Sequence, residues 1–334
     1  MKVLQIGKNN PSEFFGGIET VVKTFNESHI DNQDHVVTLV KGGESSTTNR
    51  AFGSNFFNIK RVFWLLFNVN RFDLIYVHIP NILALLPVLL FSRRAKIVCV
   101  YHSDVRKYSF IGRVYQYLTH ILLEFVDSIY CSSVNFRNSS KTLLFYKDKC
   151  EVIPFTFYFE SREEVDDGDY ILMLARDTHY KGIDFAIKAL KNTPHHVKVI
   201  GCNRSGVSNF SFYPNISEKE KWSLISGCKF VLMASTSQSE SYGLVLVEAF
   251  SRGKSVVAPN LGTGVNYLVG EDERGLTYEA SNKKSLLACV DRLSTDIDLR
   301  KTKELAVVEF YTHFLSYKIF KNKLINLVRK IVSI

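Results

Sequence analysis

The sequence predicts an α/β protein built from two doubly wound domains. Its 334 residues suit two domains of ordinary size rather than one core. Short apolar, β-rich runs alternate with helical patterns along both halves, which is typical of parallel sheets covered by helices. The segment SREEVDDGD, which begins at Ser161, holds five acids in nine residues and indicates a linker. We therefore expect an N-terminal domain over 1–158, a second domain over 159–312, and a C-terminal helix over 313–334 that packs back on the first domain.

Six strands are expected in the first half, with helices between them. The strands are VLQI, HVVTLV, FDLIYVH, AKIVCVYH, DSIYCS and CEVIPF. The expected helices cover residues 19–28, 82–91, 108–125 and 134–146. In doubly wound sheets the carboxyl ends of the strands carry the ligand, so the two domains should face each other across a cleft lined by these ends.

The same alternation of strands and helices continues in the second half. The expected strands are YILMLAR, HVKVIG, KFVLMAS, SVVAP and RGLTY. Helices are expected over 184–190, over 218–226, after Gly243, and twice more before the chain ends. This repetition predicts a second domain of the same class as the first.

The net charge of +9 points to an anionic partner, such as nucleotide phosphates or lipid headgroups. Nucleic acid is not expected, because no RNP, zinc-finger or helix-turn-helix pattern is present. No acid follows Glu309, and five basic residues lie among apolar ones in this C-terminal stretch. This pattern fits a helix on a membrane surface, or a solvated helix packed on its own domain, which we favour. The basic and aromatic stretch 60–72 leaves the same two interpretations open.

The composition also predicts a cytoplasmic location. The chain contains no run of 18 uncharged apolar residues, and MKVLQIG enters a strand directly, without an apolar signal stretch. Six scattered cysteines lack Cys-x-x-Cys spacing, which is typical of reduced core residues.

Two carboxylates, Glu240 and Glu248, form the most informative motif. Tyr242 and Gly243 break the chain between them, and the apolar run that follows predicts a helix whose N-terminus could seat a diphosphate. Glu248 would lie roughly 7 Å along that helix, about the distance from a diphosphate to the ribose diol of the same nucleotide. An amphipathic helix with one satisfied acid at its start and another on its flank explains the spacing equally well.

Three further loops follow expected strands. Gly16 and Gly17 precede a helix and allow close backbone approach to a ligand, although an ordinary tight turn fits too. His102 ends a strand in YHSD, where it is either catalytic or structural. Arg176 and Lys181 in LARDTHYKG are able to clamp a diphosphate, or simply lie solvated on the surface.

Taken together, these motifs resemble glycosyltransferase family 4, whose members have the GT-B fold of two Rossmann-like domains. SESYGLVLVEAFSRGKSVVAPNLGTGVNYLV is similar to the family's paired-glutamate signature and the loop after it. LARDTHYKGIDFAIKAL, FFGGIETVV and YHSDV are similar to its donor, N-terminal glycine and histidine motifs. Carried over residue by residue, the resemblance implies catalytic roles for His102, Arg176, Lys181 and Glu240, and donor binding by Gly16, Gly17, Tyr242, Gly243, Leu244 and Glu248.

The implied roles divide the donor into three parts. Glu248 would bind the ribose, Glu240 the hydroxyls of the donor sugar, and Arg176 with Lys181 the diphosphate leaving group. Ala175 stands where the family usually has glycine, and the segment 201–216 is shorter than usual. The resemblance therefore leaves the nucleobase open.

The resemblance implies a retaining glycosyltransferase that moves a hexosyl group from a UDP- or GDP-linked sugar. It is closest to bacterial enzymes of O-antigen, lipopolysaccharide and capsule synthesis, so we expect an undecaprenyl-diphosphate-linked or oligosaccharide acceptor. Such an enzyme would work peripherally at the cytoplasmic face of the inner membrane. We expect no cofactor and no metal, since two fixed cations, Arg176 and Lys181, can substitute for a divalent ion. A UDP-sugar 2-epimerase of the same fold and a non-catalytic nucleotide-sugar-binding subunit remain as alternatives.

Overall fold

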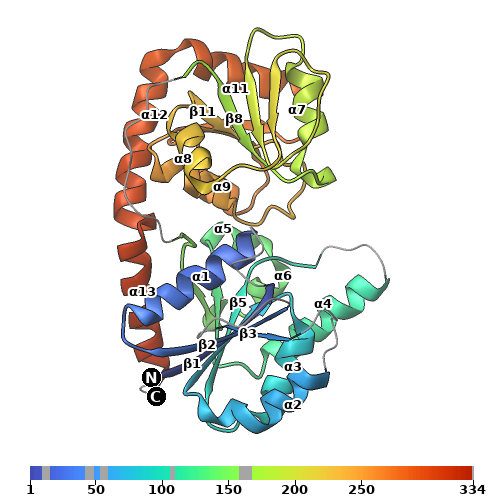
Figure 1. The fold of residues 1–334 in the computed structure, drawn as a ribbon, viewed down its shortest axis with the longest axis vertical. Helices are drawn as coiled ribbons and strands as arrows, with labels where there is room; N and C mark the ends of the chain where they lie inside the picture. Colours follow the sequence, from blue (N-terminus) through green and yellow to red (C-terminus); the bar gives the residue numbers. More distant parts are fainter. Residues whose placement is uncertain (10–15, 42–48, 53–58, 106–109, 158–167, 333–334) are drawn as a thin grey trace. The chain divides into compact units, whose positions relative to one another are not determined.

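The structure is a computed structural model that describes residues 1–9, 16–41, 49–52, 59–105, 110–157 and 168–332. It divides into two compact units (Figure 1). The first comprises Met1–Ser133, Arg137–Phe159 and Tyr317–Ile334, and the second comprises Val134–Phe136 and Glu160–Ser316. Most of the expected linker, residues 161–167, lies outside the described part of the chain, as does the expected domain boundary at residue 158.

The first unit is a seven-stranded parallel sheet in the order β3-β2-β1-β4-β5-β6-β7. Its strands are β1 (Lys2–Asn9), β2 (His35–Lys41), β3 (Asn49–Phe52), β4 (Leu74–Ile79), β5 (Lys96–Tyr101), β6 (Ser128–Cys131) and β7 (Cys150–Val152). Its helices are α1 (Gly17–Ile30), α2 (Ile59–Asn68), α3 (Ile82–Phe91), α4 (Phe110–Leu123), α5 (Val134–Ser139), α6 (Lys141–Phe145) and α13 (Tyr317–Val332). All six expected strands are present, and β3 is an additional strand at the edge.

One helical expectation in this unit needs correction. The helix expected over 134–146 is divided into α5 and α6, because the hydroxyl of Ser140 accepts a hydrogen bond from the amide of Leu143 and starts a new helix. The basic and aromatic stretch 60–72 forms most of α2 and a short 3₁₀ turn, Val69–Arg71.

The second unit is a six-stranded parallel sheet in the order β10-β9-β8-β11-β12-β13. Its strands are β8 (Ile171–Leu174), β9 (Val197–Ile200), β10 (Phe210–Tyr213), β11 (Phe230–Leu232), β12 (Val256–Asn260) and β13 (Gly275–Glu279). Its helices are α7 (Ile183–Leu190), α8 (Glu218–Ser226), α9 (Leu244–Ser251), α10 (Gly264–Val269), α11 (Lys283–Thr295) and α12 (Ile297–Phe310). A 3₁₀ turn, His179–Lys181, and a π turn, Tyr311–Leu315, complete it. The sequence reasoning missed β10 and α10.

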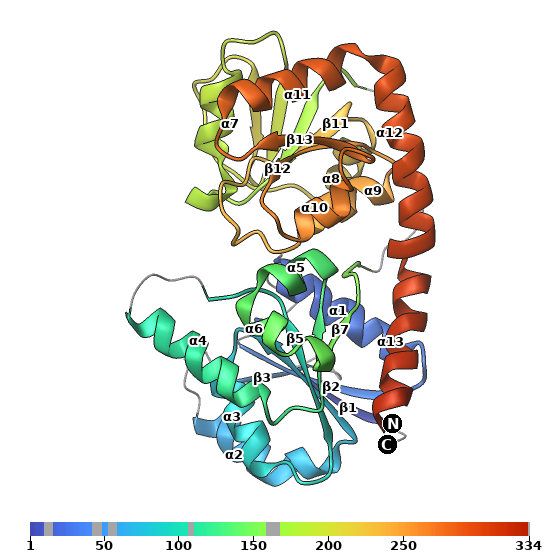
Figure 2. The ribbon, with the colours of Figure 1, turned by 180° about the vertical axis from the view of Figure 1, so that it is seen from behind.

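Both sheets reverse their strand order at one point, which positions the candidate site. In the first unit the reversal lies between β1 and β4, and in the second between β8 and β11. Helices cover the two faces of each sheet (Figures 1 and 2), so the central strands are buried on both sides; every residue of β4 is buried. Ligands of doubly wound sheets bind outside the carboxyl ends of the strands at such a reversal.

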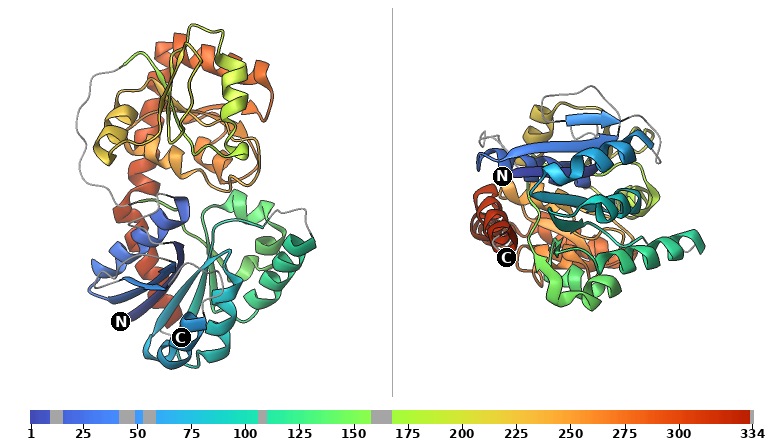
Figure 3. Two further views of the ribbon diagram at one scale, coloured as in Figure 1. Left: turned by 45° about the vertical axis from the view of Figure 1, so that its right-hand side comes forward. Right: turned by 90° about the horizontal axis from the view of Figure 1, so that it is seen from below.

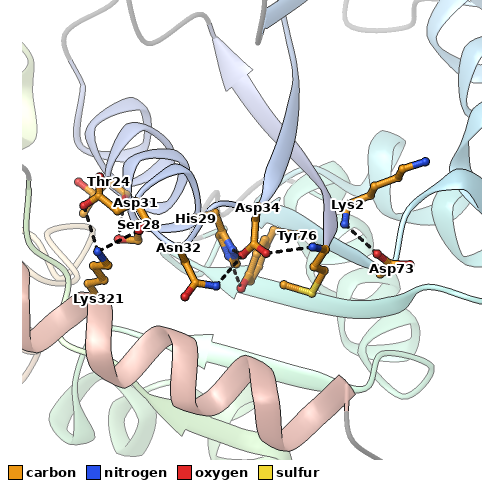
Figure 4. Close-up of polar contacts among 11 residues, drawn as sticks. Lys2, Thr24, Ser28, His29, Asp31, Asn32, Asp34, Asp73, Tyr76 and Lys321 are labelled. Carbon is orange, nitrogen blue, oxygen red and sulfur yellow. Dashed lines mark hydrogen bonds and ion pairs between the residues drawn. The ribbon is translucent and has the colours of Figure 1, made fainter.

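The C-terminal helix α13 packs on α1 within the first unit. Its apolar face is buried, and the ring of Phe320 contacts that of Phe25 with centroids 5.3 Å apart. At the end of α1, Lys321 pairs with the Asp31 carboxylate at 3.3 Å, beside the cluster of His29, Asn32 and Asp34 (Figure 4). The helix begins at Tyr317 rather than at residue 313. Because its apolar face is already covered, α13 is a solvated helix packed on its own domain.

None of the helices within the described ranges combines the length and the apolar character needed to cross a bilayer.

Candidate functional site

In the second unit, the loops that follow β8 and β11 are fastened to each other at the sheet reversal. The amide of Thr236 donates to the carbonyl of Tyr180 at 2.8 Å. Gly182 adopts φ of 69°, and a Cβ atom there would lie only 1.8 Å from the carbonyl oxygen of Ala234. Only glycine combines this left-handed backbone with so close an approach. The contact holds Lys181, at the end of the first loop, beside the second.

Lys181 and Glu240 form an ion pair at this junction. The ammonium nitrogen lies 2.5 Å from Oε2 of Glu240, and the side chains are 16% and 11% exposed. The hydroxyl of Ser235 donates to the same carboxylate oxygen at 3.1 Å. Burial lowers the pKa of Lys181, but the charge and hydrogen bond of Glu240, together with Tyr180, outweigh burial and raise that pKa above its ordinary value. Lys181 is therefore charged at neutral pH.

Arg176 adds a second positive charge to the same end of the sheet. It is exposed in the loop after β8, and its charge opposes the rise in the pKa of Lys181. Arg204, which the sequence reasoning did not select, braces this loop: its guanidinium pairs with Asp177, next to Arg176, and with Asp184 at the start of α7. A fork of this kind restricts the loop more than a single hydrogen bond would.

The Glu240–Gly243 turn leads into the N-terminus of α9. Gly243, the residue before the helix, has φ of 87° and ψ of 60°, and a Cβ there would lie 3.0 Å from Met233. The turn is fixed from the next loop, where Thr263 donates its hydroxyl to the carbonyl of Glu240 at 2.8 Å and the Gly264 amide donates to Ser241. The amides of Leu244 and Val245, at the start of α9, lie at the partially positive end of the helix, which suits an anion.

Glu248 lies on α9, one turn from its start, and is held by a lysine that the sequence reasoning also missed. Lys221 on α8 lies 3.3 Å from Oε1 of Glu248, and it pairs with Glu218 at 2.8 Å as well. Burial raises the pKa of Glu248 above its ordinary range, and Lys221 opposes that rise. Glu248 remains 19% exposed at the side chain, so it is not enclosed in the core.

In the first unit, His102 belongs to a buried chain of three polar side chains on neighbouring strands. Nε2 of His78, on β4, lies 2.7 Å from the Oε1 atom of Gln5 on β1, and Nδ1 of His78 lies 2.9 Å from Nε2 of His102, which follows β5. The Gln5 oxygen only accepts, so His78 donates from Nε2 and accepts from His102 at Nδ1. His102 then carries its hydrogen on Nε2, and its Nδ1 is an acceptor.

Both histidines are neutral at physiological pH. Burial lowers the pKa of His102 to about 3, and burial together with His102 lowers the pKa of His78 well below its ordinary value. His102 is 8% exposed and packs against the ring of Phe155. The pattern FDLIYVH, in which a strand ends on a histidine, was the available signal for His78.

Gly16 and Gly17 lie at the start of α1, as expected. The backbone of Gly16 is extended, with φ of −147°, a conformation that any residue can adopt. Glycine matters here because it has no side chain. A Cβ on Gly16 would lie 2.3 Å from a carboxylate oxygen of Glu19, whose side chain folds back over the first turn. The helix start is thus covered by its own acid, and an anion there would need that acid to move.

The structure gathers Arg176, Lys181, Glu240, Tyr242, Gly243, Leu244 and Glu248 at one end of the second sheet. His102, Gly16 and Gly17 lie at the corresponding end of the first sheet. Within the part of the chain that the structure describes, no group of three His, Cys, Asp or Glu side chains is arranged to hold a metal ion.

Residues 154–304 match the family described as glycosyl transferases group 1. The chain is a glycosyltransferase. It is 25% identical to O-antigen chain mannosyltransferase C of Escherichia coli over 331 residues, covering 88% of each chain. It is 26% identical to the D-rhamnosyltransferase WbpZ of Pseudomonas aeruginosa, covering 84% of this chain and 83% of the relative.

The fold of the glycosyltransferase is GT-B, as predicted. Its structure is similar to that of Anabaena HepE in complex with UDP and glucose, with a TM-score of 0.78, 17% sequence identity and coverage of 99% and 100% of the two chains. At that identity the likeness establishes the architecture of two Rossmann-like domains. The roles of single residues in the glycosyltransferase remain predictions.

Replacing Gly182 by alanine tests the fastening of the two loops. Gly206 is the matched control, because it also has positive φ, 80°, with nothing within 4 Å of a Cβ. Gly206→Ala should cost about 1 kcal/mol of stability from backbone strain. Gly182→Ala should cost a further ~2 kcal/mol, since the added methyl meets a backbone carbonyl, and should lower turnover by displacing Lys181. Chemical denaturation and activity assays measure both; equal losses for the two variants would refute the close approach.

The neutral histidine chain predicts a defined pH dependence of stability. His102 binds a proton in the unfolded chain below its ordinary pKa of 6.5 but in the folded chain only near 3. Its contribution is therefore complete above pH 6.5 and is lost as the pH falls, by about 2 kcal/mol at pH 5. Urea denaturation of His102→Asn should show a shallower fall in stability from pH 7 to pH 5. The exposed His313→Asn should retain the full slope; identical slopes for both variants would contradict the assignment.

Proposed function

We propose that the protein is a retaining glycosyltransferase that transfers a hexosyl group from a UDP- or GDP-linked sugar to a lipid-linked saccharide. The observation that carries the proposal is the Lys181–Glu240 ion pair beside the N-terminus of α9, with Glu248 one turn along that helix. The names of the relatives support the class of product, since one acts on O-antigen chains and the other is a rhamnosyltransferase. HepE, which shares the fold, binds UDP and glucose.

The second unit offers the elements needed to bind a nucleotide diphosphate. The amides from Leu244 onward and the cations Arg176 and Lys181 match the negative charge of the diphosphate. Glu248 supplies carboxylate oxygens that accept hydrogen bonds from a ribose diol. Lys221 holds that carboxylate in position, so its conformation is set before the nucleotide arrives. Glu240, fixed by Lys181 and Ser235, would accept from hydroxyls of the donor sugar.

Catalysis in this proposal rests on charge stabilisation at the leaving group. The anomeric C–O bond breaks, its electron pair leaves with the nucleoside diphosphate, and the acceptor oxygen bonds to the anomeric carbon as its proton passes to a phosphate oxygen. Lys181 and Arg176 offset the negative charge that develops on the diphosphate, as fixed cations preorganised for the transition state. Two fixed cations take the part that a divalent ion plays elsewhere, and we propose that the reaction requires neither a metal nor a cofactor.

In the first unit, His102 is the residue for which we propose a role in the reaction. Its Nδ1 atom, fixed as an acceptor by the chain to His78 and Gln5, suits a hydrogen bond from a hydroxyl of the transferred sugar. A neutral imidazole avoids placing another charge beside an electron-deficient anomeric centre. We propose that the acceptor is an undecaprenyl-diphosphate-linked saccharide presented at the cytoplasmic face of the inner membrane, where the positive net charge of the protein favours anionic lipid.

Donor binding is the first test of the proposal. In a thermal-shift panel of UDP-, GDP- and dTDP-sugars, the correct donor should raise the melting temperature through mass action. Glu248→Ala should weaken that donor by about 1.5–3 kcal/mol, the value of hydrogen bonds to a charged group. Glu273→Ala, which removes an exposed acid of the same unit, should leave donor affinity unchanged. A protein indifferent to every nucleotide sugar would refute the donor assignment.

The catalytic role of Lys181 is tested by turnover with the donor so identified. Lys181→Ala should lower kcat by about a thousandfold, because a charge-stabilising donor is removed from the leaving group. Lys188→Ala, an exposed lysine on α7, is the matched control and should behave as wild type. Product analysis without acceptor separates transfer from 2-epimerisation, which would release a free sugar. Near-normal turnover of the Lys181→Ala variant would exclude Lys181 from the reaction centre.

A further inference from the structure

Helix α4 exposes its apolar face to the outside, the reverse of an ordinary surface helix. A helix on the surface of a globular unit buries its apolar face and exposes its polar one. In α4 and the two residues that follow it, the outward side chains are large and apolar: Phe110, Ile111, Val114, Tyr117, Leu118, Ile121 and Phe125. Ile111 is 79% exposed and Phe110 75%. Their spacing places them in one stripe along the helix, which we call the α4 face.

Polar contacts anchor the opposite side of the helix. Gln116 donates to the hydroxyls of Tyr101 and Thr142, at 2.9 and 2.8 Å, and accepts from the amide of Val105. Tyr115 accepts a hydrogen bond at its hydroxyl from the amide of Ile82, the first residue of α3. These bonds fix the rotation of α4 about its axis. The outward position of the apolar stripe is therefore determined by the fold.

Neighbouring elements extend the apolar surface. Helix α3 packs beside α4 and exposes Leu90 (65%) and Leu86 (42%). On α6, Phe145 is 68% exposed, and its ring contacts that of His120 on α4 with centroids 4.7 Å apart. In Figures 2 and 3, α4 stands on the outside of the first unit with no other element of that unit over its outer side. Exposed apolar side chains gathered on neighbouring elements mark an interaction site.

The charges around the α4 face are mostly positive. The exposed basic residues on these helices and directly after them are Arg93, Arg94, Arg113, Lys141 and Lys147, whereas the exposed acids are Glu124, Asp127 and Asp148. In sequence, residues 80–125 contain six basic residues and two acidic ones, a net charge of +4. Apolar side chains on one helix face bordered by basic residues are the signature of an interfacial helix on anionic lipid.

We propose that the α4 face docks the protein on an anionic phospholipid surface, with α4 lying in the plane of the headgroups. At 1.5 Å per residue, the 14 residues of α4 give a stripe roughly 20 Å long. A second copy of the chain fits less well, because two-fold pairing of this face would bring like charges together. This docking surface adds to the proposed function and rests on it, since the lipid-linked acceptor of that function lies at such a membrane surface.

Vesicle flotation tests the docking surface. Wild-type protein should float with vesicles of phosphatidylethanolamine and phosphatidylglycerol and remain behind with phosphatidylcholine alone. Phe110→Ser combined with Ile111→Ser should weaken binding by about tenfold or more, because two exposed apolar anchors are lost. Leu305→Ser on α12, where the leucine is 73% exposed, is the matched control and should float as wild type does. Arg93→Gln with Arg94→Gln should weaken only the binding that depends on anionic lipid.

Three outcomes would overturn the proposal. They are a wild type that does not float, a serine double variant that floats as well as wild type, and a wild-type dimer that the double variant dissociates without any vesicle binding. The last would assign the face to a second copy. The donor panel, run on the same preparations, separates this inference from the proposed function. A wild type that floats but binds no nucleotide sugar retains the docking surface and loses the transferase assignment.

Discussion

The close approach of Gly182 to the carbonyl of Ala234 is the constraint on which the candidate site depends. It joins the loop after β8 to the loop after β11, and only then can the ammonium of Lys181 meet the carboxylate of Glu240. Each of these groups is mostly removed from water, and an ionised group left there alone would be costly. The glycine contact thus brings the two partners together, and Thr263 and Gly264 hold the turn that carries Glu240 into α9.

The reversal of strand order carries charged side chains in the second unit and neutral side chains in the first. At the reversal of the second sheet, charged pairs predominate, since Lys181 faces Glu240 and Lys221 faces Glu248. At the reversal of the first sheet, Gln5, His78 and His102 form a neutral chain whose protons are fixed by a single acceptor. Positively charged side chains suit a diphosphate, because its two phosphates are negatively charged. The neutral acceptor at Nδ1 of His102 suits a hydrogen bond from a sugar hydroxyl.

The apolar face points in different directions in two helices that mix basic and apolar residues, α13 and α4. Helix α13 turns its apolar side, including Phe320 and Leu324, onto α1 and exposes its lysines, as ordinary surface helices do. Helix α4 turns its apolar side outward, because Gln116 and Tyr115 hold its polar side against the unit. The hydrophobic pattern of a helix shows that two faces differ. Hydrogen bonds from distant residues decide which of them faces the protein.

The sequence by itself determined the repeated α/β order, the GT-B architecture and the transferase class. Buried strands such as β4 need continuous apolar runs, and Glu240 and Glu248 keep a readable spacing. Short elements were missed. The edge strands β3 and β10 have only four residues each, too few for a clear strand pattern, and the six-residue helix α10 is too short to show a helical period.

Only the tertiary structure decided which side chains became partners. Lys221 reaches Glu248 from another helix, Arg204 braces a loop 27 residues earlier, and His78 reaches His102 across adjacent strands. Local patterns report the preferences of neighbouring residues, whereas these contacts arise from strand order and loop closure, which no single segment encodes.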